Sequence, residues 1–240
     1  MISNLSILAI VPARGGSKGL PRKNVRAFYG KPLITWTIEA GHKSKYIDNL
    51  IVSTDDLEIN DTAVSAGAEV PFVRPLELGT DQTKTIDVLL HAYKTYTKNV
   101  NKNFDLVVLL EPTSPLRQVN DIDNAIEQLV KNSSMTSIVG VAKVESQHPS
   151  FLLELRDEGA LKPYLEQSPE GIRRQDLSPI YYPEGTIYVS WTKSLFEEKT
   201  FYQKKAMGFL IPSWRAIEID DEYDFIKAEA LMTRLMLDNE

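Results

Sequence analysis

Four basic side chains and three glycines lie close together near the start of the chain. Residues 12–24 read Pro-Ala-Arg-Gly-Gly-Ser-Lys-Gly-Leu-Pro-Arg-Lys-Asn and directly follow an apolar run. Glycines permit tight turns that expose backbone N–H groups, and successive N–H groups form a concavity that binds anions. The composition therefore predicts a cradle for a polyphosphate, with Arg14, Lys18, Arg22 and Lys23 as its cations.

This loop is not one of the two most familiar phosphate-binding motifs. The chain contains neither Gly-x-x-x-x-Gly-Lys-[Ser/Thr] nor Gly-x-Gly-x-x-Gly, which are the fingerprints of the P-loop and of dinucleotide binding. A solvated basic loop whose glycines only form turns is the simplest alternative. The residue types alone favour neither interpretation.

Acidic residues gather near the other end of the chain, at Glu218, Asp220, Asp221 and Asp224. Side chains at positions i and i+2 of an extended segment point to the same face, so Glu218 and Asp220 can act together. Acids at the start of a helix also cap it and complement its dipole. Taken by themselves, these residues favour the capping interpretation.

Alternating strands and helices are predicted around these groups. The run 7–11, Ile-Leu-Ala-Ile-Val, is typical of a parallel strand covered on both faces. Further strands are predicted at 50–54, 69–74, 106–110, 137–144 and 185–190. Helices are predicted by apolar spacing at 33–40, 57–66, 86–93, 122–129 and 221–237.

This alternation predicts an α/β fold, a mostly parallel central sheet with helices on both faces. Ligands of such sheets bind beyond the carboxyl ends of the strands, which selects residues 12–24, Asp55 with Asp56, and the turn 111–117. We find no internal repeat and no clear linker, so 1–240 is expected to form a single domain. The irregular stretch 145–205 is expected to be an insertion carried by that domain.

The bulk composition limits the classes of partner. The net charge is −6, whereas a general nucleic-acid binder is normally basic, so no nucleic-acid partner is expected. No apolar run reaches the roughly 20 residues that span a bilayer, and the N-terminus lacks the basic region of a signal peptide. The chain has no cysteine, which excludes a disulfide scaffold and thiolate chemistry. We expect a cytoplasmic protein without a membrane partner.

The loop resembles the N-terminal motif of the acylneuraminate cytidylyltransferases, the CMP-sialic acid synthetases. Their pattern is close to Pro-Ala-Arg-x-x-Ser-Lys-Gly-Leu-x-x-Lys-Asn. The resemblance continues in order along nearly the whole chain, through 31–33, 52–55, 74–75, 78–81, 112–117, 174–175, 185–188 and 217–220. It implies a Rossmann-like nucleotidyltransferase fold with a small insertion for dimerisation.

In that family the anomeric hydroxyl of a sugar acid attacks the α-phosphate of CTP, and pyrophosphate leaves. The resemblance implies that Arg14, Lys18 and Lys23 are catalytic and hold the triphosphate. It implies a Mg²⁺ cofactor on Glu218 and Asp220, although the first acid is usually aspartate in the family. The implied nucleotide-binding residues are Ala13, Arg14, Gly15, Ser17, Asn24 and Arg74.

The sugar site is where the chain departs from the family pattern. Positions that resemble its sugar contacts are Glu111, Arg174, Glu184, Tyr188, Phe201 and Tyr202. Glu111 replaces a typical glutamine, Glu184 a typical asparagine, and Phe151 a typical lysine. Added negative charge disfavours an unmodified anionic sugar. We therefore expect a modified nonulosonic acid, such as legionaminic or pseudaminic acid, in place of N-acetylneuraminate.

Two other functions are weighed against this one. A cytidylyltransferase for another sugar acid, such as a 3-deoxy-octulosonate, would carry a first loop without Ser-Lys-Gly. A nucleotide-binding protein without catalysis would have little need of the pair Glu218 and Asp220. The resemblance also implies a homodimer, in which segment 145–205 closes over the sugar site of the neighbouring subunit.

Overall fold

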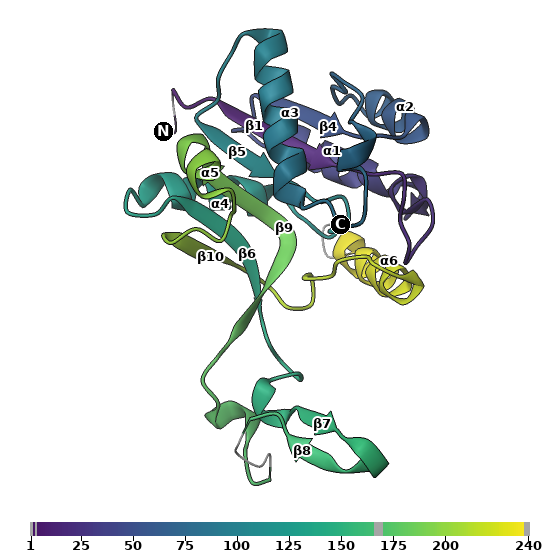
Figure 1. Cartoon of the computed structure of the whole chain (residues 1–240), viewed down its shortest axis with the longest axis vertical. Coiled ribbons are helices and arrows are strands. Elements are labelled where there is room, and N and C mark those ends of the chain that lie inside the picture. Colours follow the sequence, from purple (N-terminus) through teal and green to yellow (C-terminus); the bar gives the residue numbers. More distant parts are fainter. Residues whose placement is uncertain (1, 3, 166–169, 238–240) are drawn as a thin grey trace.

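The computed structural model describes residues 2, 4–165 and 170–237, and its body is built on one six-stranded sheet (Figure 1). The strand order is β10-β6-β9-β5-β1-β4. The bounds are β1 (Ile7–Pro12), β4 (Asn49–Ser53), β5 (Leu106–Leu109), β6 (Ser137–Lys143), β9 (Tyr181–Trp191) and β10 (Ala206–Ile211). Only β9 runs antiparallel to its neighbours β5 and β6, so the predicted, mostly parallel sheet is confirmed.

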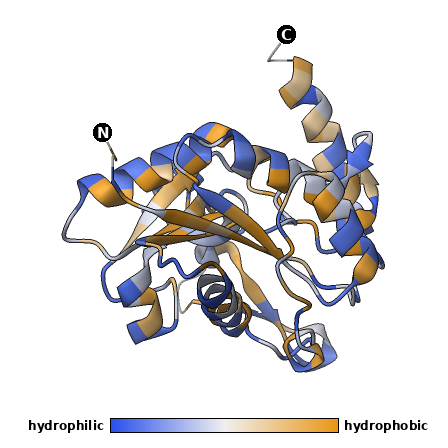
Figure 2. Cartoon of the chain, turned by 90° about the horizontal axis from the view of Figure 1, so that it is seen from above, coloured by the Kyte–Doolittle hydropathy of each residue, from blue (hydrophilic) through white to orange (hydrophobic). Residues whose placement is uncertain are grey.

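Helices cover both faces of this sheet, as predicted. They are α1 (Leu33–Lys43), α2 (Leu57–Ser65), α3 (Thr85–Val100), α4 (Val119–Lys131), α5 (Thr192–Glu198) and α6 (Glu222–Leu237). Ala9 and Val11 of β1 are buried on the side of α1, α2 and α4, whereas Leu8 and Ile10 are buried with α3 and α5. Figure 2 shows these apolar strands inside a shell of more hydrophilic helix surface.

Shorter elements complete the chain. A small antiparallel pair, β2 (Ala27–Phe28) and β3 (Lys31–Pro32), follows the first loop, and β7 (Leu153–Leu155) pairs with β8 (Leu161–Pro163). The 3₁₀ turns are η1 (Lys23–Val25), η2 (Leu76–Leu78), η3 (Pro149–Phe151), η4 (Asp157–Gly159) and η5 (Arg174–Asp176). None of the described helices combines the length and apolar character that crossing a bilayer requires.

The prediction of a strand at 69–74 was wrong. This segment makes only isolated bridges, between Ile51 and Glu69 and between Thr54 and Val73. Pro71 lies in its middle and has no N–H to donate to a ladder, which explains the interruption. Strand β10 was not predicted, and it adds a parallel edge next to β6.

The two parts of segment 145–205 lie in different places. The described residues of its first part, 145–165 and 170–180, form an arm that extends away from the body and carries β7 and β8 (Figure 1). Its second part returns to the body as β9 and α5, and Phe201 is buried in the core. The insertion that leaves the body is therefore shorter than predicted, and its role in dimerisation remains a prediction.

Candidate active site

A cleft of about 320 Å³ opens beyond the carboxyl ends of β1 and β5. Four segments line it: the first loop, Arg74 with residues from 78–88, the turn after β5, and the extended segment before α6. The first loop and the turn after β5 are two of the three positions selected from the sequence as lying beyond strand ends, whereas Asp55 and Asp56 do not line the cleft. The cleft brings together these predicted site residues: Arg14, Ser17, Lys23, Asn24, Arg74, Glu111, Glu218 and Asp220.

The first loop is fixed to the sheet by backbone contacts. The N–H of Ala13 donates to the Ser53 carbonyl at 3.0 Å, and the N–H of Gly15 donates to Oδ1 of Asp55 at 3.1 Å. A Cβ at position 15 would lie 2.6 Å from Oδ2 of Asp56, so this close approach requires glycine. The acids after β4 therefore hold the loop in shape.

Lys23 and Asn24 are buried on the inner side of the loop. The ammonium of Lys23 donates to the Ile219 carbonyl at 2.6 Å and to Oδ1 of Asp220 at 3.2 Å, which joins the loop to the predicted metal-binding segment. The amide of Asn24 donates to the Arg14 carbonyl at 3.1 Å. Its buried Oδ1 has no hydrogen-bond partner among the described residues, so it is available to a donor in the cleft.

Asp81 pairs with two of the predicted triphosphate-binding cations. Its carboxylate lies 2.7 Å from Nη1 of Arg14 and 2.5 Å from Nζ of Lys18. The Lys18 ammonium, followed by Arg14, holds the pKa of the Asp81 carboxyl below its ordinary value. We did not predict a role for this residue, although it ends the family-like stretch 78–81.

Arg74 is buried, at 3% exposure, and is not the solvated arginine that its place before a proline also suggested. Its Nε donates to the Ser53 hydroxyl at 3.1 Å, and its Nη2 donates to the Ser53 carbonyl. Burial lowers the pKa of the Arg74 guanidinium to about 10, against the opposing charge of Asp55. The group still carries a positive charge at neutral pH.

Three carboxyl groups, Glu111, Glu218 and Asp220, line the far wall of the cleft. The N–H of Ile219 donates to the Thr113 carbonyl at 2.8 Å, which holds their two segments together. Burial, followed by the charge of Glu218, raises the pKa of Glu111 to about 7. Burial also raises the pKa of Glu218, although the Gly185 N–H and Lys23 act against it. A cation bound here would relieve this concentration of negative charge.

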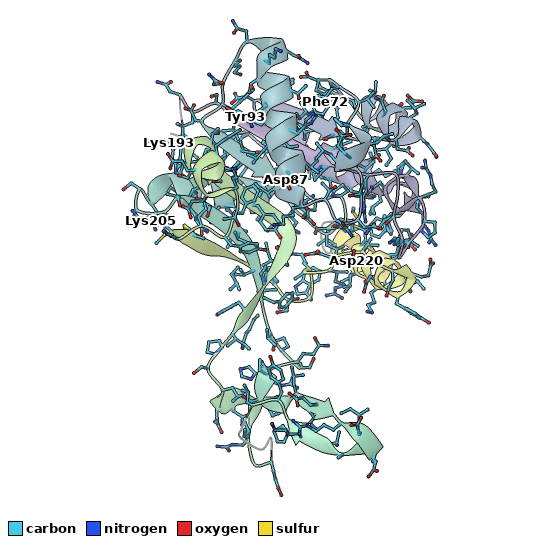
Figure 3. The ribbon with its side chains drawn as sticks, in the orientation of Figure 1. Phe72, Asp87, Tyr93, Lys193, Lys205 and Asp220 are labelled. Atoms are coloured by element: carbon cyan, nitrogen blue, oxygen red, sulfur yellow. The ribbon has the colours of Figure 1, made fainter. Side chains whose placement is uncertain are left out.

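Glu218 and Asp220 suit a magnesium ion that also binds phosphate. Within the described residues, no group of three or more histidine, aspartate or glutamate side chains could hold a metal alone. Mg²⁺ commonly takes one or two carboxylates and fills its other positions with phosphate oxygens and water. Asp220 lies just ahead of α6 on the body (Figure 3), and both acids face the cleft that Lys23 also lines.

A second cavity, of about 420 Å³, adjoins the cleft and shares Thr85 and Glu111 with it. Its wall includes the predicted sugar contacts Tyr188, Phe201 and Tyr202. The ring of Tyr188 lies 5.4 Å from that of Phe201 and 6.4 Å from that of Tyr202, measured between centroids. The aromatic cavity thus meets the cleft at Thr85 and Glu111.

Two predicted sugar contacts lie elsewhere. Glu184 is buried and lines neither cavity; its Oε2 accepts from the Thr186 N–H at 3.1 Å and from the Thr186 hydroxyl at 2.6 Å. Arg174 is exposed in the arm and lines neither cavity of its own chain. Of the three departures from the family pattern, only Glu111 lies in the site of this chain.

Two buried arginines that we had not assigned support the acidic wall. Arg117 donates to the Glu111 carbonyl at 2.7 Å and to the Thr37 hydroxyl at 2.7 Å. Arg215 forms a two-pronged ion pair with Asp121 of α4, at 2.6 and 2.9 Å, just before the segment 217–220. Their burial could not be read from the sequence, because a lone arginine is usually exposed.

The sequence is similar to those of known cytidylyltransferases. Residues 8–237 match a family model described as cytidylyltransferase. The chain is 37% identical over 230 residues to a CMP-N,N'-diacetyllegionaminic acid synthase of Legionella pneumophila, with 95% of this chain and 97% of that protein covered. It is 35% identical over 221 residues to an N-acylneuraminate cytidylyltransferase of Streptococcus agalactiae, with 91% of this chain and 51% of that longer protein covered.

The fold has solved counterparts. The structure of a CMP:2-keto-3-deoxy-manno-octonic acid synthetase complexed with CTP superposes with a TM-score of 0.70 at 17% identity, covering 96% of this chain and 99% of that one. The two chains therefore share their architecture, and the predicted nucleotidyltransferase fold is confirmed.

Proposed function

This chain belongs to the cytidylyltransferase family, and from that premise we propose that it transfers CMP from CTP to the anomeric hydroxyl of a nonulosonic acid and releases pyrophosphate. The observation that carries the proposal is the junction at Glu111. There a cleft that contains Arg14, Lys23 and Arg74 meets an aromatic cavity of a size that suits a sugar. A nucleotide and a sugar acid bound in the two spaces would meet at their shared wall.

The cleft residues suit the nucleotide half of the reaction. Phosphoryl transfer depends on positioning and on neutralising the charge that develops on the phosphates. Arg14, Lys18 and Lys23 would bind the triphosphate and stabilise the pyrophosphate that leaves, with Ser17 and the loop N–H groups assisting. The free Oδ1 of Asn24 would accept a hydrogen bond from the cytidine, and Arg74 would fix the nucleoside from the strand side.

Glu218 and Asp220 would hold Mg²⁺, which when bound supplies positive charge to the phosphate oxygens. Lys23 would keep the segment of these two acids against the first loop, because it donates to both Ile219 and Asp220. The metal and the loop would then act on the same phosphates. This metal assignment rests on the residue types and on their shared cleft.

For the sugar, we propose a modified nonulosonic acid such as legionaminic or pseudaminic acid. Glu111 lies where a typical glutamine contacts sugar in the family and would accept a hydrogen bond from a sugar N–H or O–H group. Tyr188, Phe201 and Tyr202 would pack against the apolar parts of the sugar. Glu184 accepts hydrogen bonds from Thr186 and lines neither cavity, so we do not propose it as a sugar contact.

Arg174 would act in a homodimer, reaching the sugar site of the neighbouring subunit from the arm. Its guanidinium suits a sugar carboxylate, which it can bind with two parallel hydrogen bonds. We also propose a cytoplasmic location, where CTP is available. Neither a 3-deoxy-octulosonate substrate nor a purely nucleotide-binding role is favoured by a specific feature of the site.

The proposal is tested by release of pyrophosphate from CTP in the presence of legionaminic acid, with and without Mg²⁺. We expect turnover that requires Mg²⁺ and is lost in Asp220→Ala. The matched control is Asp221→Asn, since Asp221 accepts from the Asp224 N–H at 2.9 Å and asparagine can keep that cap. Tight CTP binding without turnover on any sugar acid would favour the nucleotide-binding alternative instead.

A further inference from the structure

One carboxylate neutralises two of the three cations that we assign to the triphosphate. Oδ1 of Asp81 contacts Arg14 at 2.7 Å and Oδ2 contacts Lys18 at 2.5 Å, so each oxygen serves one cation. Neither cation has a second ion-pair partner within the described residues. The third cation, Lys23, is held separately by Ile219 and Asp220.

Asp81 approaches these cations from across the cleft. It lies on the turn between η2 and α3, whereas Arg14 and Lys18 belong to the first loop. Arg14 and Asp81 both line the cleft, whereas the exposed Lys18 does not. The carboxylate therefore occupies the cleft side of Arg14 and bridges it to Lys18 at the edge, where phosphate oxygens would have to bind them.

The turn that carries Asp81 holds its own shape. The Thr83 N–H donates to the Thr80 carbonyl at 3.2 Å, the two threonine hydroxyls lie 2.8 Å apart, and the Thr83 hydroxyl donates to the Glu77 carbonyl at 3.0 Å. None of these contacts uses the Asp81 side chain. A rotation of that side chain is thus enough to free Arg14 and Lys18, without any movement of the backbone.

We propose that Asp81 is an internal counter-ion of the nucleotide site, whose carboxylate the triphosphate displaces from Arg14 and Lys18. The inference rests on the proposed role of these two cations. Binding of CTP becomes an exchange, in which phosphate oxygens replace a carboxylate that already satisfies the cations. The exchange keeps two like charges together and ready for phosphate, at some cost in affinity.

The same exchange acts on the product. Pyrophosphate, held by Arg14 and Lys18 after the transfer, competes with a tethered carboxylate that stays within reach. Product release limits the turnover of many enzymes, so a resident competitor would shorten the time that pyrophosphate remains bound. Asp81 is in this sense a positioning residue that acts through the two cations.

The size of the effect follows from the exposure of these groups. Two exposed ion pairs are broken, and each such pair changes affinity by roughly 1.4- to fivefold. Removal of the Asp81 charge should therefore tighten the binding of a polyphosphate by roughly two- to thirtyfold. Cytidine, which has no phosphate, should bind as before.

The test is calorimetric titration of the full chain and of Asp81→Asn with pyrophosphate, CTP and cytidine at one fixed Mg²⁺ concentration. The matched control is Glu222→Gln, which makes the same change in net charge at an exposed pair with Arg26, at 2.5 and 2.7 Å, outside the cleft. We expect tighter pyrophosphate and CTP binding and stronger product inhibition by pyrophosphate in Asp81→Asn only.

Weaker or unchanged pyrophosphate binding by folded Asp81→Asn would overturn the inference, and weaker binding would mean that Asp81 orients the cations. Equal tightening in Glu222→Gln would also overturn it, since the effect would then be one of net charge. Failure of the unaltered chain to bind CTP would instead overturn the proposed function.

Discussion

Glu111 is a buried acid close to a second acid, Glu218, and it lies between the two cavities of the site. It lies on the shared wall of the cleft and the aromatic cavity. Burial and the nearby charge of Glu218 raise its pKa to about 7, while Arg117 acts in the opposite direction. The carboxyl group therefore changes its charge near neutral pH, at the point where sugar and nucleotide would meet.

This raised pKa predicts a stability that falls as pH rises. Between pH 4.5 and about 7, the unfolded chain releases a proton that folded Glu111 keeps. Rising pH therefore lowers the free energy of the unfolded state relative to that of the folded state. The contribution is fully present below pH 4.5 and is lost as pH rises through about 7. On the order of 3 kcal/mol is involved, since the pKa rises from 4.5 to about 7 and one pKa unit corresponds to about 1.4 kcal/mol.

Urea unfolding of the metal-free protein from pH 4 to pH 8 measures this effect. Glu111→Gln, which cannot ionise, should show a flatter decline over this range and exceed the original chain in stability at pH 8. Parallel stability curves for the two proteins would contradict the assignment of the shifted pKa to Glu111.

Among elements, the first loop and the segment before α6 depend on each other. Gly19 packs so closely on the Asp220 carbonyl that a Cβ there could not be accommodated without a backbone shift. Lys23 joins the same two segments by hydrogen bonds. The loop assigned to the phosphates and the acids assigned to the metal therefore share one interface.

Substitution of Gly19 by alanine should disturb this interface. Displacing catalytic groups by about an ångström can cost on the order of a hundredfold in rate, so we expect turnover to fall by roughly ten- to a hundredfold. Gly16→Ala is the matched control, because a Cβ at position 16 meets nothing within 4 Å. Steady-state rates of both variants measure this effect, and thermal melts confirm that both fold. Equal rates would contradict a mutual dependence of the first loop and the segment before α6.

The sequence predicted the elements with strong local patterns. The strands near 7–11 and 106–110 and the helices that follow them are all present, because continuous apolar runs and helical spacing are local properties. The partners of β9 and β10 are not local. β9 lies between β5 and β6 against the chain order, so its antiparallel place depends on contacts distant in sequence.

The sequence predicted site residues that belong to a recognised motif. It did not predict the contacts that these residues make in the fold. Arg14, Lys23 and Asp220 fall together in the cleft as the resemblance implied. The pairing of Asp81 with Arg14 and Lys18 was missed, because an exposed acid in a turn carries no sign of its partners. The contact of Glu184 with Thr186 was missed because the sequence does not show that this acid is buried within β9.

On the scale of the whole molecule, the arm has no role that a single chain explains. It extends away from the body (Figure 1) and exposes several large apolar side chains, among them Leu152, Leu153, Leu155, Leu161 and Tyr164. Apolar groups gathered on a protrusion are typical of an interaction surface. They agree with the proposed homodimer, in which the arm would bring Arg174 to the neighbouring subunit.

Charged substitutions on the arm test this arrangement. Leu155 and Leu161 face each other in the β7–β8 register and are 75% and 64% exposed. Replacing both by glutamate should yield monomers in analytical ultracentrifugation, raise the KM for the sugar acid and leave CTP binding unchanged. Leu57→Glu, at a 76% exposed leucine on the body, is the control. A dimer that survives the double substitution would contradict a role for this face.

The central claim is most directly tested by identifying the product formed from CTP, Mg²⁺ and a panel of sugar acids, using phosphorus NMR and mass spectrometry. We predict a CMP–sugar phosphodiester with one pyrophosphate per product, formed faster from legionaminic or pseudaminic acid than from N-acetylneuraminate or a 3-deoxy-octulosonate. A preference for unmodified N-acetylneuraminate would contradict the sugar assignment, and no CMP–sugar from any nonulosonic acid would contradict the function itself.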